Sequence, residues 1–418
     1  MKIAWICNTL IGEIAEKYNL FLDKPESWIS GLRTLFLKLD DIEIDYYFPN
    51  KEKVTFDDFN FHFYSFPSDI KYKESKNTFI FFKEAFSHST PDVIHIFGTE
   101  FPHSLSVLKA CEANGILDRC VIHIQGLVSY CAQHNSLCLP SSVINGVSLR
   151  DFLRNDSLKK QNVRFRKRGV FEIEAIKKVR NVIGRTDWDR SVVRHLNPKC
   201  NYYYCSEVLR DSFYKNRWSL ASFERHSIFI SQSNYSLKGF HVALKGLSML
   251  KSNYPDIKIY TTGKNLLDKN FISQIKLTCY QKYLVRLIRK YELEKNVVFL
   301  GYLNEERMCE RMCKSHAFVL SSFLENSPNS LGESMIVGTP SIASYVGGIS
   351  SIFKDKIDGY CYPFDEPELL AYYLTKIFES DDLAVSFSEN ARNHALDTHD
   401  KDKILSCLLS IYRDIASH

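Results

Sequence analysis

Short apolar runs alternate with helical stretches along the second half of the chain. The runs are mostly apolar and are bounded by polar residues, glycine or proline. They cover residues 225–231, 257–263, 297–303, 317–322, 340–345 and 359–364. Between the runs, apolar residues recur at helical spacing, as over residues 240–250. Strands that are apolar on both faces are typical of a parallel sheet covered by helices on both sides. The pattern predicts six βα units in a doubly wound α/β domain.

The first half of the chain predicts a second, looser α/β domain. Its apolar runs include KIAWICNT at the start, then DVIHIFG and VIHIQG, and the last two end in glycine-containing loops. We expect one helix over residues 27–39 and another over about 165–179. The pattern as a whole indicates two Rossmann-like doubly wound domains that face a cleft, with ligands bound at the carboxyl ends of their strands.

This pattern divides the chain into four parts. A Rossmann-like N-terminal domain covers residues 1–205, a linker covers 206–224, and a Rossmann-like C-terminal domain covers 225–395. The last part, 396–418, holds a helix that is a candidate for packing back on the first domain. A length of 418 residues fits this division, because domains usually contain about 100–200 residues.

Composition narrows the classes of function. The net charge of +5 is too small to indicate nucleic-acid binding, although it is compatible with an anionic substrate or a membrane surface. The 12 cysteines include no CxxC pair, so no metal site is predicted. No apolar run reaches about 18 residues, and the first residues lack the pattern of a signal peptide. We therefore expect a cytoplasmic protein with reduced thiols.

The stretch ENSPNSLGESMIVGTP, residues 325–340, carries candidate chemistry. Glu325 follows the carboxyl end of a predicted strand, and Asn329 and Ser330 begin the next helix. Free N–H groups and the helix dipole favour an anion such as phosphate at that point. Glu333, one turn later, is placed to accept hydrogen bonds from vicinal hydroxyls. The alternative is local, because Ser330 and Glu333 also match the S-x-x-E capping box.

Two glycine-containing turns of the same domain add to this stretch. Lys238 and Gly239 open the first helix of the domain, where a lysine can neutralise a phosphate leaving group. Lys238 alone also fits an ordinary surface lysine. Gly347 and Gly348 stand at a later strand-to-helix turn and allow close approach of the backbone.

The order and spacing of these motifs resemble the retaining GT-B nucleotide-sugar glycosyltransferases of family 4. The resemblance rests on E-x7-E, on K-G before a first helix, on V-x-F-L-G-Y and on GTP-x-I-A-x-x-V-G-G-I, and it covers about residues 229–378. It is weaker in the first domain, where MKI, DVIHIFG and VIHIQG carry it. It implies transfer of a sugar from a nucleotide sugar, most simply a UDP-sugar, to a glycan or lipid-linked acceptor in bacterial surface polysaccharide synthesis.

The resemblance also implies roles for individual residues. Glu325 would contact the donor sugar and Lys238 the diphosphate, as the two catalytic groups, and Glu333 would bind the ribose. The other donor-binding positions would be Asn329, Ser330 and Leu331 through their N–H groups, and Gly263, Tyr302 and Leu303 beside the base. The reaction would retain configuration, need no metal or other cofactor, and use the leaving phosphate to take the acceptor proton.

The donor side departs from the family pattern at two positions. Gln232 stands where the family usually has an arginine, so the diphosphate is one positive charge short. Arg185 is our candidate to replace that charge, with a surface or ion-paired arginine as the alternative. Pro328 stands where the family often has glycine, which removes one N–H donor and backbone freedom.

The acceptor or sugar side is expected at the strand ends of the first domain. Gln125, followed by Gly126, stands where the family usually has a histidine, and it can bond a hydroxyl but cannot usefully accept a proton. His123 lies on the same strand face two residues earlier and equally fits a packed strand histidine. His95 and His103 are further candidates for acceptor contact.

Two wider alternatives remain at this stage. The basic run RFRKR, residues 164–168, with Lys177, Lys178 and Arg180, indicates either a solvated helix face or peripheral contact with anionic lipid at the inner face of the membrane. The departures from the family pattern also fit a non-catalytic GT-B partner or nucleotide-sugar-binding protein. A nucleotide-sugar epimerase has the same architecture.

Overall fold

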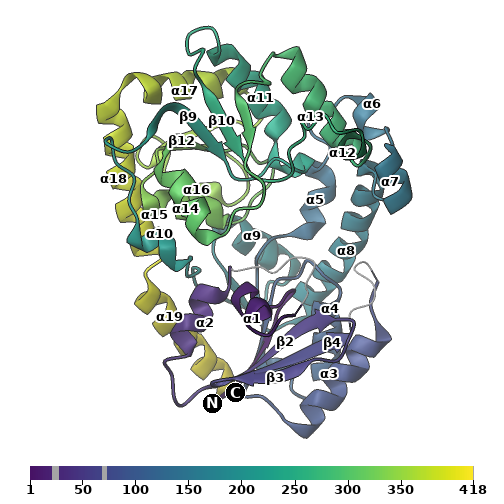
Figure 1. Cartoon of the computed structure of the whole chain (residues 1–418). Helices are drawn as coiled ribbons and strands as arrows, with labels where there is room; N and C mark the ends of the chain where they lie inside the picture. The colour runs from purple at the N-terminus through teal and green to yellow at the C-terminus, as the bar shows by residue number, and fades with distance from the viewer. Residues whose placement is uncertain (21–27, 68–72, 418) are drawn as a thin grey trace. The chain divides into compact units, whose positions relative to one another are not determined.

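The computed structural model describes residues 1–20, 28–67 and 73–417, which form two compact units (Figure 1). Unit 1 contains Met1–Tyr130, Arg164–Arg210 and His399–His418, and unit 2 contains Cys131–Val163 and Asp211–Thr398. The predicted helix start at residue 27 lies outside the described residues. No helix in the described ranges has both the length and the apolar character needed to cross a membrane.

Unit 1 is built on an eight-stranded sheet in the order β3-β4-β2-β1-β5-β6-β7-β8. All neighbours are parallel except the pair β3 and β4. The strands are β1 Lys2–Ile6, β2 Glu43–Asn50, β3 Thr55–Asp58, β4 Phe61–Pro67, β5 Val93–Phe97, β6 Cys120–His123, β7 Asn181–Gly184 and β8 Asn201–Tyr204. Its longer helices are α3 Lys76–His88, α4 His103–Ala113, α9 Asp187–Leu196, α19 Lys401–Ala416 and most of α8 Leu158–Lys178. Shorter helices are α1 Gly12–Lys17 and α2 Ser30–Phe36, and the division between the units falls within α5 Val128–His134.

The core of unit 1 surrounds Trp5, which is fully buried in β1. The Trp5 ring meets Phe36, Phe61 and Phe97 edge-on, with ring centroids 4.9–5.5 Å away. Its Nε1 donates to the hydroxyl of Tyr412 in α19 at 3.1 Å. The last helix of the chain is thus part of this core, because it satisfies a polar atom that the core buries.

Unit 2 is built on a six-stranded parallel sheet in the order β11-β10-β9-β12-β13-β14. The strands are β9 Glu224–Ile230, β10 Lys258–Thr261, β11 Val297–Phe299, β12 Ser315–Leu320, β13 Ser341–Ser344 and β14 Gly359–Tyr362. The helices are α6 Ser141–Ile144, α7 Leu149–Arg154, α10 Asp211–Lys215, α11 Phe240–Leu250, α12 Phe271–Ile275, α13 Cys279–Lys290, α14 Glu305–Cys313, α15 Asn329–Val337, α16 Ile349–Ile352, α17 Pro367–Glu379 and α18 Asp381–Thr398.

The helices of unit 2 pack in two groups, in which α11 contacts α13 and α17, and α15 contacts α10, α14 and α18 (Figure 1). The central strand β12 is buried along its whole length, as a sheet covered on both faces requires. The predicted α/β architecture, two domains each with a doubly wound parallel sheet, is confirmed.

Several predicted boundaries differ in the structure. The apolar spacing over about 270–291 predicts one long helix, but the structure has two, because the Thr278 hydroxyl accepts from the N–H of Gln281 and starts α13 with a capping box. The helix expected over about 165–179 begins earlier, at Leu158. Cys131–Val163 falls in unit 2, although the sequence-based division runs unbroken to residue 205. The expected linker over 206–224 contains α10 and the buried Trp218, whose Nε1 donates to Ser315 O at 2.8 Å.

Candidate functional site

An ion pair joins two loops at the carboxyl edge of the unit 2 sheet. Lys238 Nζ lies 2.5 Å from Glu325 Oε1, and both side chains are mostly buried, 20% and 11% exposed. Lys238 follows β9 and Glu325 follows β12, two neighbouring strands. The carboxyl ends of parallel strands meet at one edge, so residues 87 positions apart in sequence come together here.

Burial and charge act in opposite directions on Lys238. Burial lowers the pKa of its ammonium group, but the negative charge and hydrogen bond of Glu325, helped by Tyr235, raise it more. The pKa of Lys238 therefore stands above its usual value, and the side chain is a cation at every physiological pH. This makes it a fixed positive charge at the edge where parallel sheets bind ligands.

Gly239 holds the Lys238 turn in place. It adopts a left-handed conformation, φ +64°, between a short 3₁₀ turn (Ser236–Lys238) and α11. A Cβ atom on Gly239 would lie 1.9 Å from the carbonyl oxygen of Ser321 at the end of β12. Only glycine therefore allows the two strand ends to approach this closely.

Gly239→Ala is expected to destabilise the protein by about 3 kcal/mol or more, because the left-handed strain adds to a clash with backbone. Gly115→Ala is the matched control: Gly115 has φ +72° and nothing within 4 Å of an added Cβ. That variant should lose only about 1–2 kcal/mol. Urea unfolding compares the two, and equal losses would contradict the close packing at Ser321.

The loop from Glu325 also contacts a third turn and leads into α15. Gly348 N donates to Glu325 O at 3.1 Å, which ties the glycine pair before α16 to the site. Helix α15 has Pro328 at its N-cap, with no side-chain cap. The capping box suggested by Ser330 and Glu333 is therefore not formed, because Ser330 lies inside the helix.

The first turn of α15 offers N–H groups to an anion. Leu331 N donates to Pro328 O at 3.0 Å, so this predicted donor is already used. The N–H groups of Asn329 and Ser330 have no partner within the helix, as at any helix start. Glu333 is buried one turn further on.

The positions predicted to flank a base lie together after β10 and β11. Gly263 N donates to Gly301 O at 2.8 Å, and both glycines have positive φ. A Cβ atom on Gly263 would lie 2.1 Å from the amide of Asn234. Tyr302, directly after Gly301, is largely exposed, and Leu303 is half-buried. An exposed aromatic beside a glycine turn offers a planar surface for stacking.

The two residues linked to the missing family arginine differ in their surroundings. Gln232 is exposed, and its Oε1 accepts from the Tyr235 hydroxyl at 3.2 Å. Arg185 belongs to unit 1 and is buried, and its Nη1 lies 2.5 Å from Glu207 Oε2. Its Nη2 donates to Gln125 O at 3.1 Å and Gln125 Oε1 at 3.2 Å. The charge of Arg185 is thus paired with Glu207, and its side chain organises Gln125.

The predicted acceptor-side histidines are buried in unit 1. His95 and His123 stack with ring centroids 5.4 Å apart, and His95 Nδ1 lies 2.6 Å from the Tyr412 hydroxyl. Burial lowers the pKa of His95 to about 3, and burial with the neighbouring His95 and Arg185 lowers that of His123. Both rings are therefore neutral at physiological pH.

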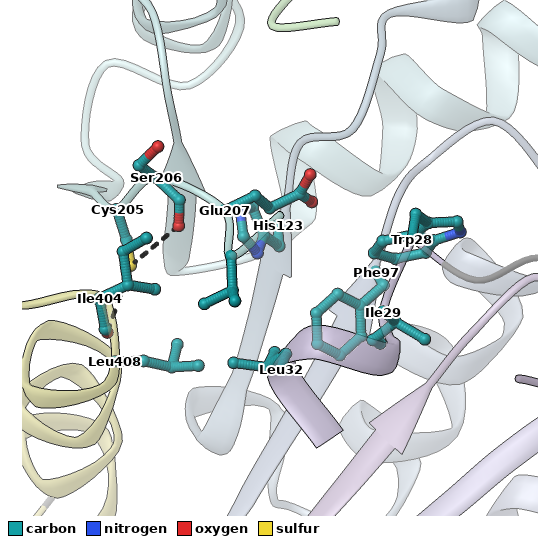
Figure 2. Close-up of a pocket in the computed structure, with 11 residues that line it drawn as sticks. Trp28, Ile29, Leu32, Phe97, His123, Cys205, Ser206, Glu207, Ile404 and Leu408 are labelled. Atoms are coloured by element: carbon teal, nitrogen blue, oxygen red, sulfur yellow. Dashed lines mark hydrogen bonds between the residues drawn. The ribbon is translucent and has the colours of Figure 1, made fainter. Parts of the chain in front are cut away.

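A pocket in unit 1 contains His123 together with residues that the sequence did not single out. Figure 2 shows Trp28, Phe97 and Glu207 among its lining side chains. Neither ring nitrogen of His123 has a hydrogen-bond partner among the described residues, and neither has Glu207 Oε1. Gly126, beside Gln125, is half-exposed at the same strand end.

Glu100 is a second acidic group that sequence reasoning missed. It follows β5, and its Oε2 accepts from Asn8 Nδ2 at 3.3 Å, just after β1. A Cβ atom added to Gly98 would lie 2.1 Å from this oxygen, and one added to Gly126 would lie 3.6 Å from Glu100 Oε1. Burial raises the pKa of Glu100 above its usual value, although Arg168 opposes the shift. The available signal was a carboxylate two residues after a glycine at a strand end.

Glu172 on α8 positions the loops after β5 and β6. Its buried carboxylate accepts from Thr99 Oγ1 at 2.8 Å and from the N–H groups of Val128 and Ser129 at 3.0 and 2.9 Å. Burial raises its pKa to about 7, although these hydrogen bonds lower it. The sequence did not indicate this role, because the helix around Glu172 is rich in lysine and arginine.

The raised pKa of Glu172 predicts a pH-dependent stability. The folded protein holds this proton up to about pH 7, whereas the unfolded chain releases it near pH 4.5. Protonation of Glu172 therefore contributes on the order of 3 kcal/mol to the free energy of unfolding below pH 4.5, and this contribution is lost by about pH 7. Urea unfolding at several pH values should show this decline relative to Glu172→Gln. Glu174→Gln, which changes an exposed glutamate of the same helix, should keep the decline in stability with pH. If stability depended on pH in the same way in the wild type and in Glu172→Gln, the raised pKa would not belong to Glu172.

Comparison with known proteins identifies most of unit 2. Residues 212–394 match the family model described as Glycosyl transferases group 1. We call this matched part of the chain the group 1 domain. The domain contains Lys238, Glu325, the first turn of α15 and the Gly263–Gly301 contact.

Relatives in other organisms match about a third of the chain. The N-acetyl-alpha-D-glucosaminyl L-malate synthase of Bacillus anthracis is 26% identical over 132 residues, which are 32% of this chain and 34% of that protein. The matched segment thus spans about a third of the relative's length.

Solved structures extend the likeness to the whole chain at the level of fold. The sucrose-phosphate synthase of Thermosynechococcus elongatus has a TM-score of 0.70 at 13% identity, covering 100% of this chain and 99% of its own. HepE of Anabaena in complex with UDP has a TM-score of 0.67 at 15% identity, covering 99% and 100%. The chain therefore has the GT-B fold.

Proposed function

We propose that this protein transfers a sugar from a nucleotide sugar, most simply a UDP-sugar, to a hydroxyl of a glycan or lipid-linked acceptor, with retention of configuration. The observation that carries the proposal is the Lys238–Glu325 ion pair at the carboxyl edge of the group 1 domain. The UDP bound to HepE, a protein of the same fold, supports the choice of nucleotide. Synthesis of a bacterial surface polysaccharide is the biological role that we propose.

The donor side would work through charge. Lys238 and the N–H groups of Asn329 and Ser330 would stabilise the diphosphate as it leaves. A diphosphate that attracts Lys238 would release Glu325 to accept hydrogen bonds from the donor sugar. Glu333 would bind the ribose, and Tyr302 with the Gly263 turn would flank the base.

The transfer step balances without a metal or other cofactor. The bond from the anomeric carbon to the phosphate oxygen breaks, and a bond to the acceptor oxygen forms on the same face. The acceptor proton moves to the leaving phosphate oxygen, so the products are the glycoside and the nucleoside diphosphate. Lys238 stabilises the negative charge that develops on this leaving group.

The acceptor side is proposed to lie in unit 1, at the ends of β1, β5 and β6. Glu100 and Gln125 are the groups that can bond acceptor hydroxyls there. His95 and His123 are neutral and buried, so we propose that they shape this region of unit 1 and transfer no proton.

Peripheral contact of a cytoplasmic protein with anionic lipid is also proposed. The basic helix α8 supplies fewer free cations than its sequence indicates. Lys178 pairs with Glu112 and Arg180 with Asp118, while Arg168 donates to Glu100 O and stacks on Phe101. Of the cations that the sequence predicted for this contact, Arg166, Lys167 and Lys177 remain exposed outside these pairs. Their contribution to lipid contact would therefore be modest.

Incubation of the purified protein with UDP-, GDP- and TDP-sugars tests the proposed function. A donor at 100 times its dissociation constant should add about 2.7 kcal/mol of stability, which thermal shift detects. Release of nucleoside diphosphate and the anomeric configuration of the product, measured by NMR, test transfer and retention. Binding without release would indicate a non-catalytic nucleotide-sugar-binding protein. An isomerised free nucleotide sugar would indicate an epimerase.

A further inference from the structure

Helix α7 in unit 2 turns its apolar face outward. Leu149, Phe152 and Leu153 lie at positions i, i+3 and i+4 and are 53%, 74% and 71% exposed. Val147, just before the helix, is also exposed. An amphipathic helix of a globular protein normally turns this face to the core, so the orientation of α7 is inverted.

The polar face of α7 is fixed to the rest of unit 2. Asp151 is only 2% exposed and forms a capping box with Ser148, at 3.1 and 3.2 Å. Its Oδ2 also accepts from Cys279 N, at the start of α13, at 2.7 Å. The capping box lies within the start of α7, so the bond to Cys279 N is the one that rotating α7 to bury its apolar face would break; this bond favours the outward orientation.

A second apolar site stands beside the same helix start. Phe271 and Ile272 of α12 are largely exposed, and α12 ends four residues before Cys279. Gly146, just before α7, packs so closely on Cys279 that an added Cβ would lie 2.4 Å from its Sγ. Figure 1 labels α6, α7, α12 and α13 in one region of unit 2. We call Val147, Leu149, Phe152, Leu153, Phe271 and Ile272 the α7–α12 patch.

Exposed cations flank both parts of the α7–α12 patch. Arg154 ends α7, Lys159 and Lys160 begin α8, and Lys269 and Lys276 stand on either side of α12. The acidic groups beside α7 are occupied: Asp151 is buried, and Asp156 lies 2.7 Å from Arg150 Nη1. Beside α12, Asp268 is half-buried and accepts from Asn270 N, so these five cations outnumber the acidic groups at the rim of the patch.

We propose that the α7–α12 patch docks on the surface of an anionic lipid bilayer. Phenylalanine and leucine side chains would enter the boundary between headgroups and acyl chains, while the lysines contact negative headgroups. A protein partner fits less well, because lysine is depleted from protein–protein interfaces. This surface uses the first two lysines of α8, Lys159 and Lys160, and not the RFRKR run at residues 164–168, and it does not depend on catalysis.

Flotation of the purified protein with vesicles tests this proposal. We expect binding to vesicles that contain phosphatidylglycerol and little binding to pure phosphatidylcholine. The double variant Phe152→Ser with Leu153→Ser should bind about tenfold or more weakly, because two apolar anchors are lost. The double variant Lys159→Gln with Lys160→Gln should lose about fivefold per lysine, and the loss should shrink in high salt.

Phe59→Ser is the matched control, since Phe59 in unit 1 is 80% exposed and lies outside the patch. It should bind vesicles like the wild type. Thermal unfolding of every variant checks the fold, and release of nucleoside diphosphate from donor without vesicles checks the proposed function separately. The proposal would be overturned if the double variant Phe152→Ser with Leu153→Ser bound vesicles as strongly as the wild type. Equal binding of the wild type to both vesicle types would also overturn it. Self-association of the wild type that the same variant abolishes would instead assign the patch to a second copy of the chain.

Discussion

Lys238→Ala is expected to lower the rate of sugar transfer about 100- to 1000-fold, because a preorganised charge on the leaving group is lost. The lysine is mostly buried and held by Glu325 at 2.5 Å, so no mobile surface cation can take its exact place. The measurement is release of nucleoside diphosphate at saturating donor. Circular dichroism and thermal unfolding should show a folded protein.

Lys245→Ala provides the control for Lys238→Ala. Lys245 lies on the following helix, α11, and forms an ion pair of 2.9 Å with Glu368, but both side chains are exposed. Exposed ion pairs contribute about 0–1 kcal/mol, so this variant should retain wild-type turnover and stability. Near-normal turnover by Lys238→Ala would contradict the role proposed for this lysine in stabilising the leaving group.

Glu325→Gln is expected to lower transfer about 100-fold or more while nucleotide binding persists. The amide keeps the size of the side chain, but it cannot accept hydrogen bonds through both terminal atoms or balance Lys238. Because Lys238 loses its partner, its affinity for a diphosphate should stay equal or increase. Calorimetry with UDP and turnover with donor separate these two effects.

Glu368→Gln is the control for Glu325→Gln, since it removes the same charge from the exposed pair with Lys245. It should change neither UDP affinity nor turnover. If Glu325→Gln lost UDP binding and turnover together, Glu325 would support the folded loop rather than the donor sugar. Unchanged transfer would refute its proposed role outright.

The fold of unit 2 could be predicted from its apolar runs because each strand of a covered parallel sheet must be apolar on both faces. β12 shows this in six consecutive buried residues. The break before α13 was harder to predict, since the apolar spacing continues through it and only the Thr278 cap interrupts the helix. The antiparallel edge strand β3 was missed because its four residues, TFDD, carry little hydrophobic signal.

The candidate site was predictable only in part. Strand order at the sheet edge brings Lys238 to Glu325, and sequence spacing alone does not contain that order. The S-x-x-E motif suggested a capping box, but Pro328 occupies the N-cap position instead. The candidate charge of Arg185 is paired with Glu207, 22 residues later, which no local pattern indicates.

The class of the fold and the residue types at the strand ends could be predicted without a structure, because apolar periodicity and glycine turns are local properties of the chain. Tertiary structure decided which of those residues meet and which are already satisfied. Burial neutralised His95 and His123, the packing of α13 fixed α7 with its apolar face outward, and neighbouring strands joined Lys238 to Glu325. Each of these outcomes depends on desolvation and on contacts between residues far apart in the sequence.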